Sequence, residues 1–161
     1  IRPQYHEKNI SGASPSKLVR AHALGKALSA ASLIPKGRIL SADTVVYFKK
    51  KIIGKPRDMK NAFRILTALQ GRWHEVYTGT VFLEVGEGKI QRRAVIVEKT
   101  RVRLRPMSRK EITLYFKKIS PLDKAGAYAI QVKKGGIVEE VKGSFSNAVG
   151  LPVERLKNLI G

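Results

Sequence analysis

The stretch Ala42–Pro56 reads ADTVVYFKKKIIGKP, and the rest of the chain can be placed around it. Its β-branched and aromatic residues predict a strand that ends near Phe48. Three lysines at 49–51 then predict a turn, and Ile52-Ile53 a short return strand before the Gly-Lys-Pro turn. The stretch is therefore a strand followed by a hairpin.

Asp43 and Thr44 interrupt this otherwise apolar strand. A buried carboxylate without a partner loses its charge or destabilises the fold, so we expect Asp43 at the rim of a cleft. The hairpin then directs Lys55 back toward Asp43. A carboxylate and an ammonium group that converge on a cleft suit a phosphorylated, metal-bound substrate, although an ordinary Asp–Lys ion pair would give the same pattern.

The length and composition predict one domain with a real core. The chain has 161 residues, of which 43% are apolar and 27% charged, as in ordinary globular proteins. The absence of cysteine excludes disulfides and thiolate metal sites, and the three histidines (His6, His22 and His74) lack metal-ligand spacing. No apolar run approaches the ~20 residues of a membrane span, and no signal-peptide pattern is seen, so we expect a cytoplasmic protein.

The chain is strongly basic, with 32 Lys and Arg against 12 Asp and Glu and a net charge of +20. Such a charge attracts polyanions, and a non-catalytic nucleic-acid-binding protein is therefore one alternative. The basic residues are spread along the whole chain, which is typical of a solvated surface. Aromatic residues make up only 7% and lie mostly in apolar patterns, so a nucleic-acid partner is not expected.

The first predicted helix has Ser14 as its N-cap and Pro15 in its first turn. Its expected buried face consists of four apolar residues at helical spacing: Ala21, Leu24, Leu28 and Ala31. Lys26 flanks this face, and we expect it to be an ordinary solvated lysine unless other information assigns it a role.

Three more helices and several strands follow. Asp58 caps a helix with Ala62, Phe63, Leu66 and Leu69 on its apolar face, and Ser108 and Glu111 form a capping box for the next helix. The remaining expected elements are strands at 73–85, 89–105 and 137–141, a binding loop at 122–131, a polar turn at 143–147 and a short helix after Pro152. This order predicts an α/β fold with a mixed sheet. Glycine-rich dinucleotide and phosphate-loop motifs are absent from the sequence.

Five blocks of sequence carry a resemblance when they are taken in order. They are Ala42–Val46 with Gly54-Lys55-Pro56, Gly71–Gly79 (GRWHEVYTG), Asp123–Tyr128 (DKAGAY), Ile130-Gln131 and Ser144–Pro152 (SFSNAVGLP). In this order the chain resembles the Maf family of nucleoside triphosphate pyrophosphatases. The resemblance implies a two-lobed α/β fold with an elongated, bent mixed sheet, flanking helices and a central cleft.

The same resemblance implies that residues 1–161 form a single Maf-like domain. Family members begin with a strand and a Ser-Ser-Pro-Arg-Arg-type loop, and this chain starts after that motif. A truncated, inactive family member is therefore a further alternative.

The implied activity is hydrolysis of a nucleoside triphosphate to the monophosphate and pyrophosphate with a divalent metal cation, Mg or Mn. Thr44 after the aspartate and Gln131 after the isoleucine fit the branch that acts on dTTP and UTP, with modified nucleotides as further candidate substrates. A glutamine amide carries both a donor and an acceptor, which can pair with a uracil or thymine edge. The family is also linked to arrest of cell division, and a homodimer is one expected assembly.

The resemblance also assigns roles to individual residues. Asp43 matches the proposed proton acceptor, and Lys26 and Lys55 match phosphate contacts. Asp43 and Glu7 are the expected metal ligands. These roles agree with the chemistry, because a triphosphate carries about four negative charges that lysines and a metal must offset.

Overall fold

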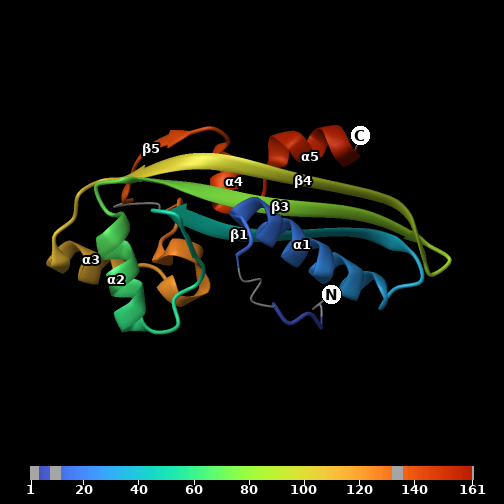
Figure 1. The fold of residues 1–161 in the computed structure, drawn as a ribbon, viewed down its shortest axis with the longest axis horizontal. Coiled ribbons are helices and arrows are strands. Elements are labelled where there is room, and N and C mark those ends of the chain that lie inside the picture. Colours follow the sequence, from blue (N-terminus) through green and yellow to red (C-terminus); the bar gives the residue numbers. More distant parts are fainter. Residues whose placement is uncertain (1–3, 8–11, 132–135, 161) are drawn as a thin grey trace.

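The computed structural model describes residues 4–7, 12–131 and 136–160 (Figure 1). Its elements are α1 (Pro15–Ala31), β1 (Gly37–Phe48), β2 (Lys51–Ile53), α2 (Met59–Leu69), β3 (Trp73–Gly86), β4 (Lys89–Leu104), α3 (Arg109–Phe116), the 3-10 turns η1 (Pro121–Asp123) and η2 (Ala125–Ala127), β5 (Val138–Lys142), α4 (Phe145–Val149) and α5 (Val153–Ile160). The three predicted caps are confirmed. Ser14 and Asp58 accept hydrogen bonds from the amides of Lys17 and Asn61, and Ser108 and Glu111 form the capping box.

The five strands form one sheet in the order β2-β1-β3-β4-β5, and every neighbouring pair is antiparallel. The α/β class is confirmed, but the predicted mixed sheet is wrong for the described strands. β2 and β3 run in the same direction, because each is antiparallel to β1. Since β1 lies between them, the two parallel strands are never neighbours.

Two hydrophobic cores lie on opposite faces of this long sheet. Val76 of β3 belongs to the core that α2 and α3 cover, whereas Val81 belongs to the core under α1. These two valines are five residues apart, and successive strand residues point to opposite faces. Figure 1 shows α2 and α3 together at one end of the sheet and α1 extending toward the other.

The predicted buried face of α1 is confirmed in part, since Ala31 is buried and Leu24 packs against the core under this helix. Leu28 is 41% exposed, and the buried positions within the helix are Pro15, Val19, His22, Ala23, Ala27, Ala30 and Ala31. Small side chains on this face let α1 approach the backbone of β3. A Cβ on Gly79 would lie 2.5 Å from the carbonyl oxygen of Val19, so only glycine fits at this contact. Because Gly79 pairs with Asp43 in the sheet register, this approach brings α1 beside Asp43.

The predicted polar turn at 143–147 instead contains the short helix α4. Its Asn147 is fully buried, and the amide Nδ2 donates to Oγ1 of Thr100 at 2.9 Å. Thr78 donates to the carbonyl oxygen of Asn147 at 3.1 Å. Thr78 and Gly79 are adjacent in β3, so α4 and α1 cover opposite faces of the sheet.

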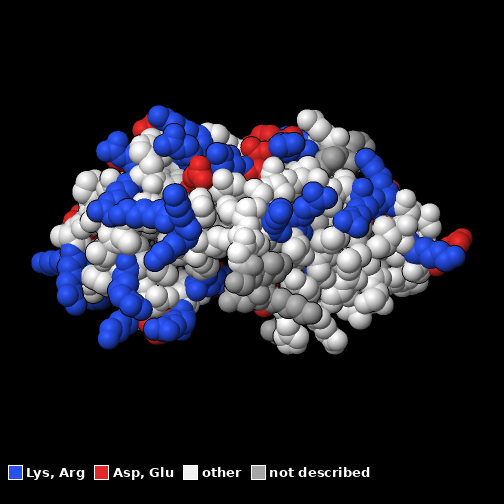
Figure 2. Space-filling view, viewed as in Figure 1, with Lys and Arg blue, Asp and Glu red and all other residues white. Residues whose placement is uncertain are grey.

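Lys and Arg side chains spread over the visible face in Figure 2 and are densest over the end formed by α2, α3 and β5. This distribution agrees with the solvated basic surface expected from the sequence. Within the described part of the chain, no helix combines the length and apolarity needed to cross a membrane.

Candidate active site

A pocket of about 860 Å³ lies beside the open edge of β1. β2 pairs only with Val46–Phe48, so the earlier part of β1 has no partner on that side among the described strands. Residues of α1, β1, the Gly54-Lys55 turn, the 123–131 loop and α4 line the pocket. All six predicted site residues are among them: Glu7, Lys26, Asp43, Thr44, Lys55 and Gln131. Residues from distant parts of the sequence therefore meet as the blocks predicted.

Lys26 is the direct partner of two acids that line the pocket, Glu7 and Asp43. Its Nζ lies 2.6 Å from Oδ1 of Asp43 and 2.8 Å from Oε1 of Glu7. Burial opposes its charge, but hydrogen bonds to the two carboxylates raise the pKa of Lys26 above its ordinary value. The hydrogen bond from Lys26 also lowers the pKa of Glu7. The expectation that Lys26 is an ordinary solvated lysine is therefore wrong, because its side chain is only 22% exposed and bridges two acids.

Lys55 lines the same pocket as Asp43, as the hairpin pattern predicted. Among the described contacts, however, the ammonium group that pairs directly with Asp43 is that of Lys26. The positive charge of Lys55 lowers the pKa of Asp123, although Lys124 has the larger effect on that carboxyl. Lys55 is exposed and so remains available to a ligand in the pocket.

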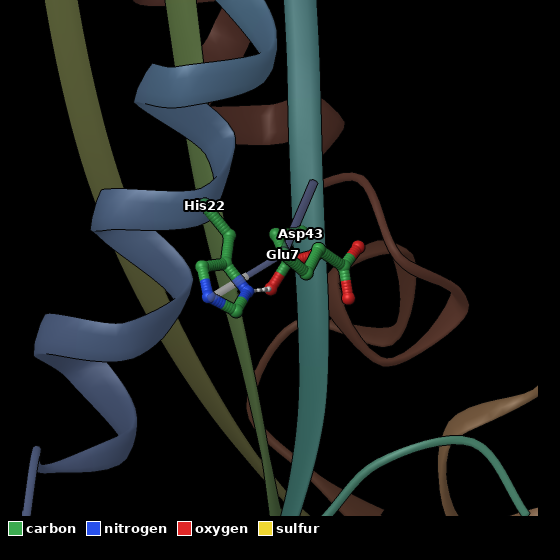
Figure 3. Close-up of side chains that lie close together, drawn as sticks. All are labelled: Glu7, His22 and Asp43. Atoms are coloured by element: carbon green, nitrogen blue, oxygen red, sulfur yellow. Dashed lines mark ion pairs between the residues drawn. The ribbon is translucent and has the colours of Figure 1, made fainter. Parts of the chain in front are cut away.

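His22 is a pocket residue that the sequence analysis missed. Its Nδ1 lies 3.5 Å from Oδ2 of Asp43, and its ring contacts Tyr5 edge to face at 6.0 Å between centroids. Figure 3 shows His22 on α1, with its ring facing Asp43 on β1. Histidine spacing alone gave no signal. His22 and Lys26 are four residues apart in a helix, however, and this spacing places them on the same face. A role for Lys26 in the pocket therefore predicts that His22 lies near the pocket too.

Glu7, His22 and Asp43 could together hold a metal ion. Each offers one ligand atom, and these atoms all lie within 4.8 Å of one another. The histidines lack metal-ligand spacing in the sequence, but the fold brings His22 beside two acids that are distant from it in the chain. The group mixes carboxylate oxygens with an imidazole nitrogen, both of which bind divalent cations.

The opposite wall is held by hydroxyl groups and the loop. Oγ1 of Thr44 lies 2.9 Å from Oγ1 of Thr78, whose own bond to Asn147 ties the pocket to α4. The amide of Gly126 donates to the carbonyl oxygen of Gly54 at 3.2 Å, which joins the loop to the turn carrying Lys55. Gln131 is exposed and ends the described part of this loop.

Tyr128 anchors the same loop inside the protein. Its hydroxyl lies 2.7 Å from Nε2 of His74, and the two rings meet edge to face. Burial lowers the pKa of His74 to about 4 and raises that of Tyr128, so both side chains are neutral at pH 7. A neutral buried pair therefore supports the charged pocket.

Comparison with known proteins gives the family. The sequence matches the family described as Maf-like protein over residues 1–161. The chain belongs to the Maf family. It is 42% identical over 161 residues to a dTTP/UTP pyrophosphatase of Gloeobacter violaceus, a match that covers 99% of this chain and 82% of that protein.

Two further relatives agree in name and coverage. A dTTP/UTP pyrophosphatase of Thermosipho melanesiensis is 40% identical over 160 residues, covering 99% of this Maf chain and 83% of the relative. A dTTP/UTP pyrophosphatase of Carboxydothermus hydrogenoformans is 40% identical over 156 residues. This match covers 97% of this chain and 82% of that relative. The resemblance identified from the five blocks is therefore confirmed.

Proposed function

We propose that this Maf chain hydrolyses dTTP and UTP to the monophosphate and pyrophosphate in the pocket beside β1. The observation that carries the proposal is that Asp43, Lys55 and Gln131, from two separate blocks, line one pocket. The relatives named dTTP/UTP pyrophosphatase support the substrate class. The two cores on opposite faces of the sheet support a two-lobed arrangement with this pocket as the central cleft.

The lysines offset the charge of the triphosphate. Lys55 is exposed at the pocket and is free to meet the phosphate tail as it enters. Lys26 lies deeper, where a ligand phosphate can compete with Glu7 and Asp43 for its ammonium group. Electrostatic stabilisation of the phosphate oxygens is the main contribution a protein makes to phosphoryl transfer.

Asp43 is the proposed proton acceptor for the attacking water. Its carboxylate is only 9% exposed, and Lys26 holds Oδ1 at 2.6 Å. A carboxylate buried to this extent has little freedom to turn away from a water molecule beside the α-phosphorus. The water oxygen attacks the α-phosphorus and forms the new P–O bond while its proton passes to Asp43. The bond between the α-phosphorus and the bridging oxygen breaks, and pyrophosphate leaves. Such base catalysis contributes about 10²–10⁴-fold.

The acids fit a divalent cation, which would supply further positive charge next to the triphosphate. Glu7 and Asp43 would be the carboxylate ligands. Support comes from the position of Lys26, whose ammonium group already lies between their oxygens. The site therefore attracts positive charge.

Gln131 and Thr44 are the proposed base-recognition residues. The Gln131 amide can donate to a pyrimidine carbonyl and accept from N3–H, whereas an adenine or guanine edge leaves these groups mismatched. Thr44 is oriented by its hydroxyl contact with Thr78. Since dTTP and UTP are cytoplasmic metabolites, we place the activity there. The homodimer stays a prediction.

A pyrophosphate-release assay across the common nucleoside triphosphates, with Mg²⁺ or Mn²⁺, tests the proposal. We expect turnover of dTTP and UTP well above that of dATP and dGTP. Preferred hydrolysis of a purine nucleotide, or no turnover of any nucleotide by the folded protein, would rule it out.

A further inference from the structure

The arrangement of His22 beside Asp43 carries an inference about which metal this site takes. We propose that the imidazole of His22 is a direct metal ligand, which with Glu7 and Asp43 forms a site that binds Mn²⁺ in preference to Mg²⁺. The inference rests on the proposed function, since it specifies the cation of the same site.

The geometry of His22 and Asp43 suits two ligands of one ion. Nδ1 of His22 lies 3.5 Å from Oδ2 of Asp43. Two ligand atoms bound at about 2.0–2.2 Å, at angles between octahedral and tetrahedral values, lie roughly 2.8–3.6 Å apart. The observed separation of 3.5 Å falls inside that interval. It is longer than the distance of about 2.7–3.2 Å in a good hydrogen bond.

The fold holds these two ligands in place before any ion binds. The side chains of His22 and Asp43 are 8% and 9% exposed, and they come from α1 and β1. Close packing of α1 on Gly79 fixes the distance between these elements, because Gly79 is the register partner of Asp43. Tyr5 packs against the His22 ring and also lies over Gly25, so the segment carrying Glu7 is seated on the same helix.

Lys26 marks the attraction of this position for a cation. Its ammonium group is within 2.8 Å of oxygens from both Glu7 and Asp43. A divalent ion bound by the same oxygens would displace the ammonium group by repulsion and by competition for lone pairs. The freed Lys26 would then face the pocket in which the triphosphate is proposed to bind.

The ligand set distinguishes between the two metals that the family resemblance left open. Mg²⁺ prefers oxygen ligands in strict octahedral geometry and keeps several waters, so an imidazole adds little to its affinity. Imidazole nitrogen binds first-row transition metals more readily, while carboxylates suit Mn²⁺. Two carboxylates and one imidazole therefore favour Mn²⁺ and leave coordination positions for water or phosphate.

Mn²⁺ bound to the nucleotide-free protein gives a direct test by pulsed electron paramagnetic resonance, which detects a directly coordinated histidine nitrogen. We expect a histidine nitrogen coupling in the wild-type protein and in His6→Gln, the control for the exposed histidine next to Glu7. We expect its loss in His22→Gln. Titrations should give at least tenfold weaker Mn²⁺ binding in His22→Gln, with Mg²⁺ binding changed less than threefold.

The wild-type and His6→Gln proteins decide the matter even if His22→Gln does not fold. The third histidine, His74, is buried against Tyr128 in the other core, so a coupling that persists in His6→Gln is assigned to His22. Mn²⁺ bound without nitrogen coupling, or a coupling lost only in His6→Gln, would overturn the inference. Because no nucleotide is present, nitrogen coupling in a protein that hydrolyses nothing would refute the proposed function alone. Turnover of dTTP without the coupling would refute this inference alone.

Discussion

Nζ of Lys26 lies 2.6 Å from Oδ1 of Asp43, and this ion pair joins α1 to β1 across the inner end of the pocket. The same ammonium group holds Glu7, so two acids share one cation. The contact depends on the small-residue face of α1, which packs against Gly79 of β3. Site electrostatics and helix packing are therefore linked through a single contact between two elements.

Replacing Lys26 with Met should destabilise the protein, because it leaves two neighbouring carboxylates without their shared cation. Breaking a fully buried pair costs 3–5 kcal/mol, and the partial exposure of Lys26 reduces the expected loss to about 1–2 kcal/mol. Urea denaturation at pH 7 measures this loss. Lys26→Arg is the control and should keep most of the stability, whereas equal stability of wild type and Lys26→Met would contradict the bridging role.

Gly79→Ala should separate α1 from β3. The new Cβ would lie 2.5 Å from the Val19 carbonyl oxygen, and overpacking of this kind costs about 1–3 kcal/mol. Gly54→Ala is the matched control for stability, since a Cβ there meets nothing within 4 Å. Thermal denaturation should give a lower melting temperature for Gly79→Ala only. Equal melting temperatures would show that α1 does not pack as described.

The grouping of the site residues could be predicted from the sequence more fully than the packing of the helices. Asp43, Lys55 and Gln131 were placed in one site because their order matched a family pattern, and the structure brings them together. The caps of α1, α2 and α3 were predicted correctly because capping depends on local hydrogen bonds that the sequence displays directly.

The missed features depend on contacts between distant segments. The buried face of α1 was partly misassigned because its alanines offer little hydrophobic contrast, and the contact with Gly79 that selects the face is not local. His22 was missed because its partners Glu7 and Asp43 meet it only in the fold. The all-antiparallel sheet was missed because the sequence shows where helices lie between strands, but not which strands pair with one another.

The stability of the protein should fall as the pH drops from about 6.5 to about 4, because burial lowers the pKa of His74 to about 4. In this window the unfolded chain binds a proton at His74 that the folded protein does not, so acid favours unfolding. The full shift corresponds to about 3 kcal/mol, and below pH 4 the effect no longer grows.

Denaturation of wild type and His74→Asn at several pH values measures the contribution of His74. The comparison between pH 6.5 and 5 is the most useful, because most carboxyl groups titrate at lower pH. The free energy of unfolding should fall less steeply in His74→Asn. Identical pH slopes for the two proteins would exclude His74 as the cause.

Gln131→Ala should weaken the discrimination between pyrimidine and purine nucleotides. Loss of hydrogen bonds at an exposed position corresponds to about 1–1.5 kcal/mol, or roughly tenfold in kcat/KM for dTTP and UTP. Steady-state kinetics with dTTP, UTP and dATP measure the change, with Gln91→Ala as a control on the exposed part of β4. An equal loss for all three nucleotides would indicate a general role for Gln131 and none in base recognition.

Oxygen-18 labelling tests the central claim most directly. In labelled water with dTTP, we predict that the label enters the monophosphate, that pyrophosphate is unlabelled, and that Asp43→Asn slows turnover by at least about 10²-fold while still binding the nucleotide. Attack at the α-phosphorus would be contradicted by label in pyrophosphate, or by release of the nucleoside diphosphate and inorganic phosphate. Unchanged turnover in Asp43→Asn would contradict the role of Asp43 as the proton acceptor.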